Sequence, residues 1–219
     1  MTLDIRARLG RLPEFDPKSR NYPIRSLVGE KPLRSYTWSV GVFLDQDDTP
    51  ACTGFAGAAE LAARPQVVPG VADDWGQRFY QRARQLDQWP GEDYDGSSVL
   101  GVVKALQEDG WYSGYRWAFG ERDLALAVGY AGPAIIGINW YEGMFWPDNQ
   151  GFLRPTGAIA GGHAILVNKI NLPGDYYQVH NSWGRGWGVN GTAKISRQDM
   201  TRLLAEDGEA AFPIRRPLR

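Results

Sequence analysis

The stretch His180-Asn181-Ser182-Trp183-Gly184-Arg185-Gly186-Trp187-Gly188 decides how this chain folds. It overlaps the end of the segment Tyr176–Trp183, which has the aromatic-rich pattern of a strand. The segment His163–Asn171 also has the pattern of a strand, and the two segments are separated by Leu172-Pro173-Gly174-Asp175, a composition typical of a turn. We therefore expect an antiparallel hairpin that brings residues around 163 and 181 together.

The hairpin also predicts which histidine can act with Asn181. A tight loop centred on Pro173 places Ile165 opposite Asn181, so His163 becomes a diagonal neighbour of Asn181 on the same face. His180 is adjacent to Asn181 and must point to the other face. We therefore expect His163 to be the functional histidine and His180 to be a surface or packing residue.

The rest of the chain divides into a helical first half and a strand-rich second half. Residues 1–35 are rich in Pro, Arg and charge and predict an irregular arm laid over the body. Apolar spacing and turn residues then predict an α+β architecture with two lobes in one domain, 1–219, mainly helical over about 36–120 and mainly β over about 121–219. The predicted helices are Pro50–Arg64, Asp74–Gln88, Ser98–Asp109 and Glu121–Val128, and the predicted strands are Ala134–Trp140, His163–Asn171, Tyr176–Trp183 and Thr192–Ile195.

The single cysteine, Cys52, lies at the start of the first long predicted helix. Thr49 suits the N-cap and Pro50 the first helical position, which would place Cys52 in the first turn. The helix dipole there favours a thiolate over a thiol. Cys52, His163 and Asn181 together have the residue types of a nucleophile, a base and a group that orients the base.

A thiol nucleophile that attacks a carbonyl also needs donors for the developing oxyanion. The backbone N–H of Cys52 is one candidate, since helix N-termini leave such groups free. The side-chain amide of Gln46, six residues earlier, is the other. This chemistry requires that the Cys52 sulfur is not sealed inside packing and that the His163 ring points toward it.

Composition excludes several classes of protein and function. The 219 residues are 43% hydrophobic with a net charge of −1, which excludes a disordered chain and gives no electrostatic reason to expect nucleic acid or an anionic membrane as partner. No apolar run is long enough for a transmembrane helix, and the N-terminus lacks the apolar run of a signal peptide, so we expect a cytoplasmic protein. One cysteine excludes an intramolecular disulfide and a multi-thiolate metal site, and we expect no metal and no cofactor.

These motifs resemble the papain/cathepsin family of cysteine peptidases. Gln46 followed by Cys52-Thr53-Gly54-Phe55-Ala56 resembles the nucleophile helix of the family, Gly161-Gly162-His163-Ala164 its base strand, and the Asn181–Gly188 stretch its most specific signature. The resemblance implies a papain-like two-lobed fold, with the nucleophile helix in the helical lobe and the His and Asn in an antiparallel, barrel-like β lobe.

The resemblance also implies a role for each matched residue. Cys52 would be the nucleophile, His163 the base, Asn181 its orienter, Gln46 the oxyanion glutamine, and Trp183 the indole that shields the His–Asn contact. Less specific matches place substrate-binding residues. These are Gly96 and Ser97 as a backbone strip that pairs with an extended peptide, Gly162 before the base, and Ala134 with Ala160 in the main specificity pocket.

The implied activity is cleavage of peptide bonds in a peptide or protein substrate, by an endopeptidase that forms a thioester intermediate. His163 and Asn181 follow Cys52 by 111 and 129 residues, fewer than the roughly 130–150 of the family signature, so the chain resembles a compact bacterial or phage branch. Two alternatives stay open. One keeps the enzyme but changes the substrate, as a cell-wall peptide amidase or transpeptidase like those of phage lysins. The other is an inactive scaffold that binds within a larger, virion-associated assembly, for which the departures at Thr53 and Gly162 from the usual residues leave room. Only about 45 residues precede Gln46, so either latency is absent or the 1–35 arm provides a different lid.

Overall fold

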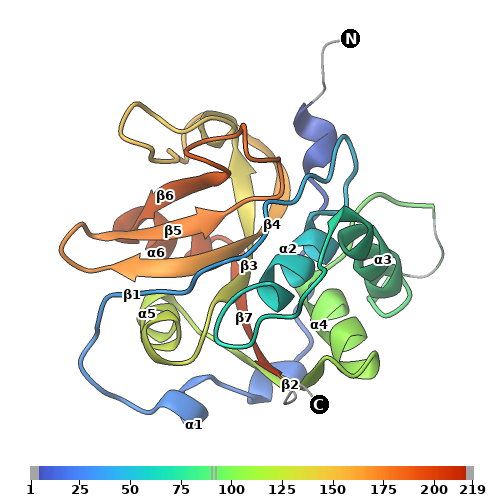
Figure 1. The fold of residues 1–219 in the computed structure, drawn as a ribbon, viewed down its shortest axis with the longest axis horizontal. Coiled ribbons are helices and arrows are strands. Elements are labelled where there is room, and N and C mark those ends of the chain that lie inside the picture. The colour runs from blue at the N-terminus through green and yellow to red at the C-terminus, as the bar shows by residue number, and fades with distance from the viewer. Residues whose placement is uncertain (1–4, 90, 92, 216–219) are drawn as a thin grey trace.

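The computed structural model describes residues 5–89, 91 and 93–215. Residues 1–4 of the expected arm, on which much of the signal-peptide argument rests, lie outside this part. The helices between residues 52 and 108 lie on one side of the molecule, and the antiparallel sheet lies on the other together with the helices Glu121–Tyr130 and Arg197–Ala205 (Figure 1). The α+β architecture predicted from the sequence is confirmed.

The helical side is built around α2 (Cys52–Leu61), with α3 (Asp73–Arg84) and α4 (Val99–Glu108) packed beside it. All ten residues of α2 are buried, because it lies between the sheet and the other helices. Gly54 permits this close packing, since a Cβ added there would lie 2.2 Å from the Gly76 carbonyl oxygen of α3. Small residues in α2 therefore serve close helix contact, as the sequence predicts.

The sheet has the strand order β2-β7-β3-β4-β5-β6, and the short β1 pairs with β4. All four predicted strands appear, with different ends, and Leu166 and Val167 of β4 pair with β5 in the predicted register before a bulge shifts the pairing by one residue toward the turn. The strands are β1 (Tyr36–Thr37), β2 (Tyr112–Trp117), β3 (Ala134–Tyr141), β4 (Ile159–Asn171), β5 (Tyr176–His180), β6 (Thr192–Ser196) and β7 (Glu209–Arg215).

Three strands were not predicted: the two-residue β1, β2 and β7. β2 lies in the range expected to be mainly helical, yet it pairs with β7 from the end of the chain. β7 contains Pro213, which argues against a strand in sequence. Pro213 is tolerated because β7 pairs with β3 only through residues 209–211 and leaves 213 beyond that ladder.

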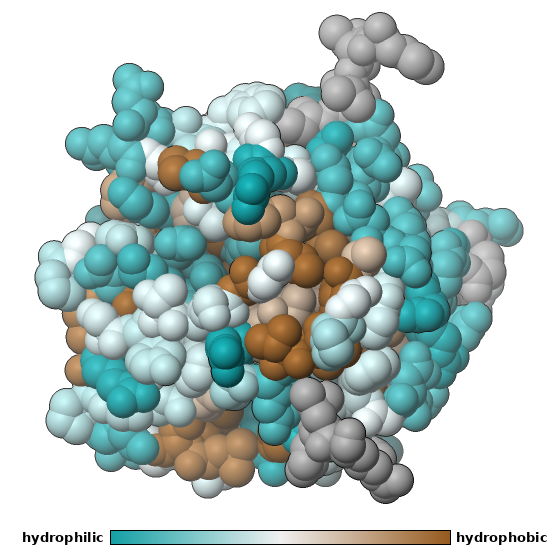
Figure 2. Space-filling view, in the orientation of Figure 1, coloured by the Kyte–Doolittle hydropathy of each residue, from teal (hydrophilic) through white to brown (hydrophobic). Residues whose placement is uncertain are grey.

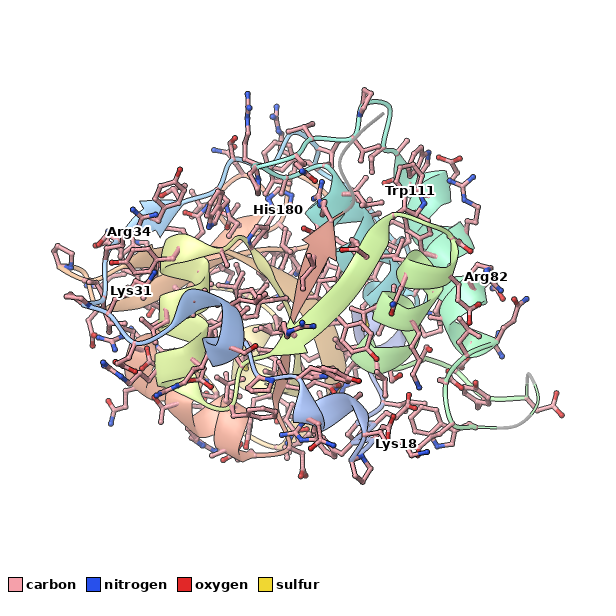
Figure 3. All side chains as sticks on the ribbon, turned by 90° about the horizontal axis from the view of Figure 1, so that it is seen from below. Lys18, Lys31, Arg34, Arg82, Trp111 and His180 are labelled. Atoms are coloured by element: carbon pink, nitrogen blue, oxygen red, sulfur yellow. The ribbon has the colours of Figure 1, made fainter. Side chains whose placement is uncertain are left out.

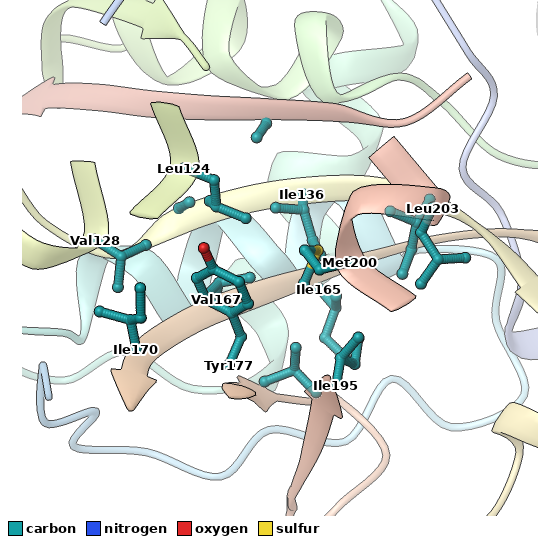
Figure 4. Close-up of a cluster of buried hydrophobic side chains, with 14 of the residues drawn as sticks. Leu124, Val128, Ile136, Ile165, Val167, Ile170, Tyr177, Ile195, Met200 and Leu203 are labelled. Carbon is teal, nitrogen blue, oxygen red and sulfur yellow. The ribbon is translucent and has the colours of Figure 1, made fainter. Parts of the chain in front are cut away.

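Each face of the sheet covers a separate hydrophobic core. Alternate residues of β3 point to opposite sides, so that Ile136 and Ile138 join one core and Ile135 joins the other. The first core lies under α5 (Glu121–Tyr130) and α6 (Arg197–Ala205), and it contains Leu124, Tyr177 and Met200 (Figure 4). The helix α6 was not predicted from the sequence. The second core is shared with α2, α3 and α4.

The arm runs over both regions, as expected. It contains the 3-10 turns Ile5–Arg8 and Ser19–Asn21 and the short helix α1 (Arg25–Val28). Its later part is fixed beside α5, where the cations of Lys31 and Arg34 lie over the Tyr130 ring at 4.5 and 4.2 Å from the centroid (Figure 3).

On the face of the molecule shown in Figure 2, apolar residues gather near the middle, over α2 and the segment that follows it. Among the described residues, no helix is both long and apolar enough to span a bilayer.

Candidate active site

Cys52 is the first residue of α2, not a residue one turn inside it. The helix is preceded by Ala51, which makes no side-chain cap, and the predicted N-cap Thr49 instead donates its hydroxyl to the Gln46 carbonyl at 2.6 Å. The prediction that Thr49 caps the helix is therefore wrong, because a turn between Gln46 and Thr49 uses that hydroxyl. Cys52 still lies in the first turn, where the helix dipole favours an anion.

His163 and Asn181 meet as the predicted hairpin requires. His163 Nε2 lies 2.8 Å from Asn181 Oδ1, which also accepts a hydrogen bond from the Ser182 backbone N–H at 2.9 Å. Because a backbone N–H can only donate, the shared acceptor is the amide oxygen, and His163 must carry its proton on Nε2. The opposite ring nitrogen, Nδ1, is buried without a hydrogen-bond partner and keeps its lone pair free to accept a proton.

The sulfur of Cys52 lies beside the strand that carries His163. The backbone N–H of Ala164, the next residue, donates to Cys52 Sγ at 3.4 Å. The thiol is fully buried, and burial raises its pKa to about 11, although backbone N–H groups of Ala164, Gly10 and Thr53 lower it. Burial also lowers the pKa of His163 to about 4, so the pair is a neutral thiol and a neutral imidazole in this state.

Gln46 is held in place with its amide group turned toward a carbonyl. Its Oε1 accepts from the Ser182 hydroxyl at 2.7 Å, which fixes the orientation of the side chain. Its Nε2 donates to the Arg8 carbonyl at 3.0 Å and to the Thr49 carbonyl at 2.6 Å. A buried amide N–H that already binds a peptide carbonyl of the arm is suited to bind the carbonyl oxygen of another peptide.

Aromatic rings enclose the His163–Asn181 contact. Trp183, 4% exposed, lies with its ring centroid 4.9 Å from that of His163. Trp140 of β3, which sequence reasoning missed, lies at 4.7 Å in an edge-on arrangement. The one sequence signal for Trp140 is the alternation of side chains along β3 and β4. Trp140 pairs with Gly161, which lies two residues before His163 and therefore on the same face of the sheet. Such a dry, apolar enclosure strengthens the hydrogen bond between His163 and Asn181.

The cleft next to Cys52 is occupied by the arm. Gly10 accepts from the Ser97 N–H at 2.9 Å and Leu12 donates to the Ser97 carbonyl at 2.9 Å, so the arm runs parallel to this strip. On the other side, the Arg11 N–H donates to the Gly162 carbonyl at 3.0 Å. The residues predicted to bind an extended peptide, Ser97 and Gly162, thus hold an extended segment of the chain itself.

Glycines make this close approach possible. A Cβ on Gly96 would lie 2.4 Å from the Gly10 carbonyl oxygen, and one on Gly162 would lie 2.1 Å from the Arg11 carbonyl oxygen. A Cβ on Gly10 would lie 1.9 Å from the Pro50 carbonyl oxygen. The burial of the sulfur, which the sequence hypothesis did not expect, therefore coincides with a tightly fitted cover made by the arm.

Two arginines of the arm pair with acidic residues of the cleft. Arg8 contacts Asp45 at 3.3 Å and Asp48 at 3.4 Å, at the partly exposed end. Arg11 Nε lies 3.1 Å from Glu209 Oε1, and both side chains are completely buried. Burial raises the pKa of Glu209 to about 7, although the neighbouring Arg11 guanidinium lowers it. Nothing in the sequence pattern indicated Glu209, because β7 itself was not predicted.

Ala134 does not lie at this cleft. It belongs to the core under α5 and pairs with Val167, on the face of β3 opposite to Ile135. Gly137, three residues further along the strand, faces the arm instead, since a Cβ there would lie 2.7 Å from Arg11 Nε. The placement of Ala134 in the pocket is corrected to Gly137, because an odd number of residues along a strand changes the face. Ala160 packs against the same core as Ala134.

His180 is separated from this site. It is 4% exposed, its ring lies 5.1 Å from that of Phe43, and burial lowers its pKa to about 4. Within the described residues, no group of three or more His, Cys, Asp and Glu side chains is arranged to hold a metal ion.

Comparison with known proteins assigns part of the chain to a family. The profile of the family described as papain family cysteine protease matches residues 103–211, which contain His163 and Asn181. The matched region, 103–211, belongs to the papain family of cysteine proteases. Its sequence is similar to cathepsin O, with 29% identity to the Mus musculus protein and 31% to the Homo sapiens protein over 105 residues.

The matched region is short relative to those relatives. It covers 46% of this chain but only 33% and 32% of the two cathepsin O sequences, so this chain spans about a third of their length. Among solved structures it resembles xylellain, a cysteine protease from Xylella fastidiosa, with a TM-score of 0.67, 16% identity and 96% of both chains covered. The bromelain protease of Ananas comosus, solved with the inhibitor E64, gives 0.62 at 17% identity, covering 85% of this chain and all of that one.

Proposed function

We propose that this chain is a cysteine endopeptidase that cleaves peptide bonds with Cys52 as nucleophile. The observation that carries the proposal is the pairing of His163 Nε2 with Asn181 Oδ1 at 2.8 Å, while the N–H of the next residue, Ala164, contacts the Cys52 sulfur at 3.4 Å. This arrangement leaves the second nitrogen of His163 free to take the thiol proton.

The proposed mechanism gives a role to each of the residues Cys52, His163, Asn181, Gln46 and Trp183. His163 removes the proton of Cys52, and the thiolate attacks the carbonyl carbon of the substrate. Gln46 Nε2 and the Cys52 N–H stabilise the oxyanion, and His163 then gives its proton to the leaving amine. Water, deprotonated by His163, hydrolyses the thioester and regenerates the thiol. Asn181 and Trp183 keep the imidazole oriented and dry.

Substrate must replace the arm, because Gly10 and Arg11 already use the hydrogen-bonding groups of Ser97 and Gly162. These contacts support the alternative in which the arm provides a lid, and under this proposal the structure is a closed form. The burial of Cys52 also favours the alternative of an inactive scaffold, which the same experiment tests.

The test combines labelling with turnover. An epoxide thiol-peptidase inhibitor should add its mass to the peptide that contains Cys52, and the assignment is unambiguous because the chain has one cysteine. A fluorogenic peptide panel should be hydrolysed by the wild type and at least about 10³-fold more slowly by Cys52→Ala. Equal turnover by the two proteins, or a folded chain that never takes the label, refutes the proposal.

The finer predictions from sequence are proposals of the same kind. The compact bacterial or phage branch is supported by the likeness to xylellain over 96% of both chains. If Cys52 is labelled but no soluble peptide is cleaved, clearing of whole cell walls would support the amidase or transpeptidase alternative. The cytoplasmic or virion-associated location stays a prediction.

A further inference from the structure

One face of the strands β5 and β6 is not covered by a helix. Tyr177 and Ile195 join the first hydrophobic core, so the alternate residues Gln178 and Lys194 point to the opposite face. Among the described residues, none of β5 or β6 joins the second core, which α2, α3 and α4 share. Figure 1 shows both strands at the end of the sheet away from α3 and α4. This side of the strands, with its half-buried polar residues, is called the outer face below.

Two lysines lie in one row across the outer face. Gln178 of β5 pairs with Lys169 of β4 on one side and with Lys194 of β6 on the other. Adjacent strands are about 4.8 Å apart, which places the two lysine backbones about 10 Å from each other. Their ammonium groups converge on the Tyr176 ring, at 5.5 and 5.2 Å from its centroid. Lys194 also lies 5.2 Å from the Phe152 ring, which meets Tyr176 edge-on at 5.9 Å.

The charge of these two lysines is not neutralised by the protein itself. Among the described residues, neither lysine forms an ion pair with a carboxylate. The acidic side chains at the border of the outer face are already paired with arginines. Asp148 contacts Arg154 at 2.8 Å, and Asp175 contacts Arg197 at 3.6 Å. The outer face therefore carries an excess of positive charge that only a ligand can neutralise.

The hydroxyl of Tyr176 lies at the centre of this positive charge. It accepts a hydrogen bond from Asn171 Nδ2 at 3.0 Å. Burial raises the pKa of Tyr176, but the hydrogen bond from Asn171 and the ammonium groups of Lys169 and Lys194 outweigh burial, so the pKa is lowered. The same surroundings that favour a negative oxygen on Tyr176 favour the carboxylate oxygens of a ligand.

The positive charge continues along the strands. His180 lies at the far end of β5 from Tyr176, and its ring is 5.1 Å from that of Phe43. The guanidinium of Arg185, an exposed residue, lies over the Phe43 ring at 4.2 Å from the centroid. The outer face thus presents cations at both ends of β5, as binding of an extended, negatively charged chain requires.

The arrangement of the rings and the total charge favour one class of anionic chain. Single-stranded nucleic acid stacks its bases on open aromatic faces, whereas Tyr176 and Phe152 meet edge-on and turn ring faces to ammonium groups. A dense polyanion also experiences the net charge of the whole chain, which is −1. A short segment with spaced carboxylates responds mainly to charges within about 10 Å, because salt screens the more distant ones.

We propose that the outer face is a docking surface for an acidic segment of another protein. Carboxylates of the segment contact Lys169 and Lys194, and the side-chain amide of Gln178 between them hydrogen-bonds to its backbone. The docking surface is separate from the cleft, and the proposal does not depend on the peptidase function.

The test measures binding of an acidic peptide to the full chain. A dye-labelled peptide that alternates glutamate with threonine is titrated by fluorescence anisotropy, with Cys52→Ala in every protein so that cleavage cannot consume it. Binding should weaken as the salt concentration rises, because surface ion pairs are screened. A peptide with glutamine in place of every glutamate should bind at least about tenfold more weakly. Equal affinity of the two peptides overturns the proposal.

Paired lysine variants locate the binding site. Lys169→Gln/Lys194→Gln should weaken binding of the acidic peptide about tenfold. Lys169→Arg/Lys194→Arg, which keeps the charge, should bind within about twofold of the parent. Lys18→Gln/Lys104→Gln changes the net charge equally but outside the outer face, and should also bind within about twofold. Similar losses in the two glutamine variants would show that only net charge matters and overturn the proposal.

Two other polyanions test the class of partner. A short thymidine oligonucleotide and a sulfated hexasaccharide, both dye-labelled, are titrated under the same conditions. Each should bind more weakly than the acidic peptide. Tighter binding of either one, lost in Lys169→Gln/Lys194→Gln, overturns the assignment of the outer face to an acidic protein segment.

Discussion

The walls of the cleft and the arm that covers them are held by different forces. Cys52 and His163 stand on α2 and β4, elements packed into the two hydrophobic cores. Residues 8–12 of the arm are held mainly by backbone hydrogen bonds and by ion pairs of Arg8 and Arg11, and only Leu9 among them packs against one of these cores. Apolar burial fixes the walls in one geometry, whereas polar contacts can be exchanged for those of a peptide. The difference indicates a permanent site beneath a replaceable cover.

The largest expected effect is the difference in kcat between a variant of His163, in the cleft wall, and a variant of His180, outside it. His163→Gln removes the base and should lower kcat by roughly 10³-fold, as general-base removal does. His180→Gln, on the opposite face of the hairpin, should lower it less than about threefold. Peptide turnover under saturating substrate measures both. Similar losses in two folded variants would contradict the assignment of the base.

The pH dependence of thiol alkylation tests what the cover does to the site. With the pKa of Cys52 near 11 and that of His163 near 4, the thiolate fraction at pH 7 is about 10⁻⁴. Alkylation of the closed wild-type chain by iodoacetamide should therefore accelerate about tenfold per pH unit from 7 to 10. Mass spectrometry follows the adduct, with glutathione as reference thiol. A rate that is already constant above pH 6 would mean that the pair is a thiolate and an imidazolium.

A steric change can open the cover without altering the walls. Gly10→Ala introduces a Cβ 1.9 Å from the Pro50 carbonyl oxygen, and the arm must move away from Cys52. Alkylation and turnover at pH 7.5 should rise about tenfold. Gly132→Ala is the matched control, since a Cβ there meets nothing within 4 Å, and it should change neither. Unchanged reactivity in Gly10→Ala would show that the arm is not what closes the site.

The smallest effect concerns the contribution to stability of His180, which lies outside the cleft. Its pKa is lowered to about 4 by burial, so the folded chain does not bind the proton that the unfolded chain binds below about pH 6.5. Its contribution is present above pH 6.5 and is lost as the pH falls toward 4. The unfolding free energy of the wild type relative to His180→Gln should drop by about 1–2 kcal/mol between pH 7 and pH 5. Urea unfolding at the two pH values measures it, and a constant difference would contradict the neutral, buried state.

The sequence by itself determined the hairpin and what it carries. The turn at Leu172–Asp175 joins β4 and β5, and beyond an unpredicted bulge between Val167 and Lys169 the strands pair in the predicted register, so that the period of two places His163 beside Asn181 and His180 on the other face. Local rules suffice here because the partners are close in sequence. The same local reasoning failed at Thr49, where a tight turn took the hydroxyl that a cap would have used.

Only the tertiary structure decided what covers the cleft and which residues line it. The arm reaches Ser97 and Gly162, and β7 brings Glu209 to Arg11, across separations of 86, 151 and 198 residues. Such contacts depend on the path of the whole chain and leave no periodic signal in sequence. Pro213 argued against a strand at β7. The pairing of β3 with β4 and β7, and no sequence motif, determines which face of β3 lies toward Arg11.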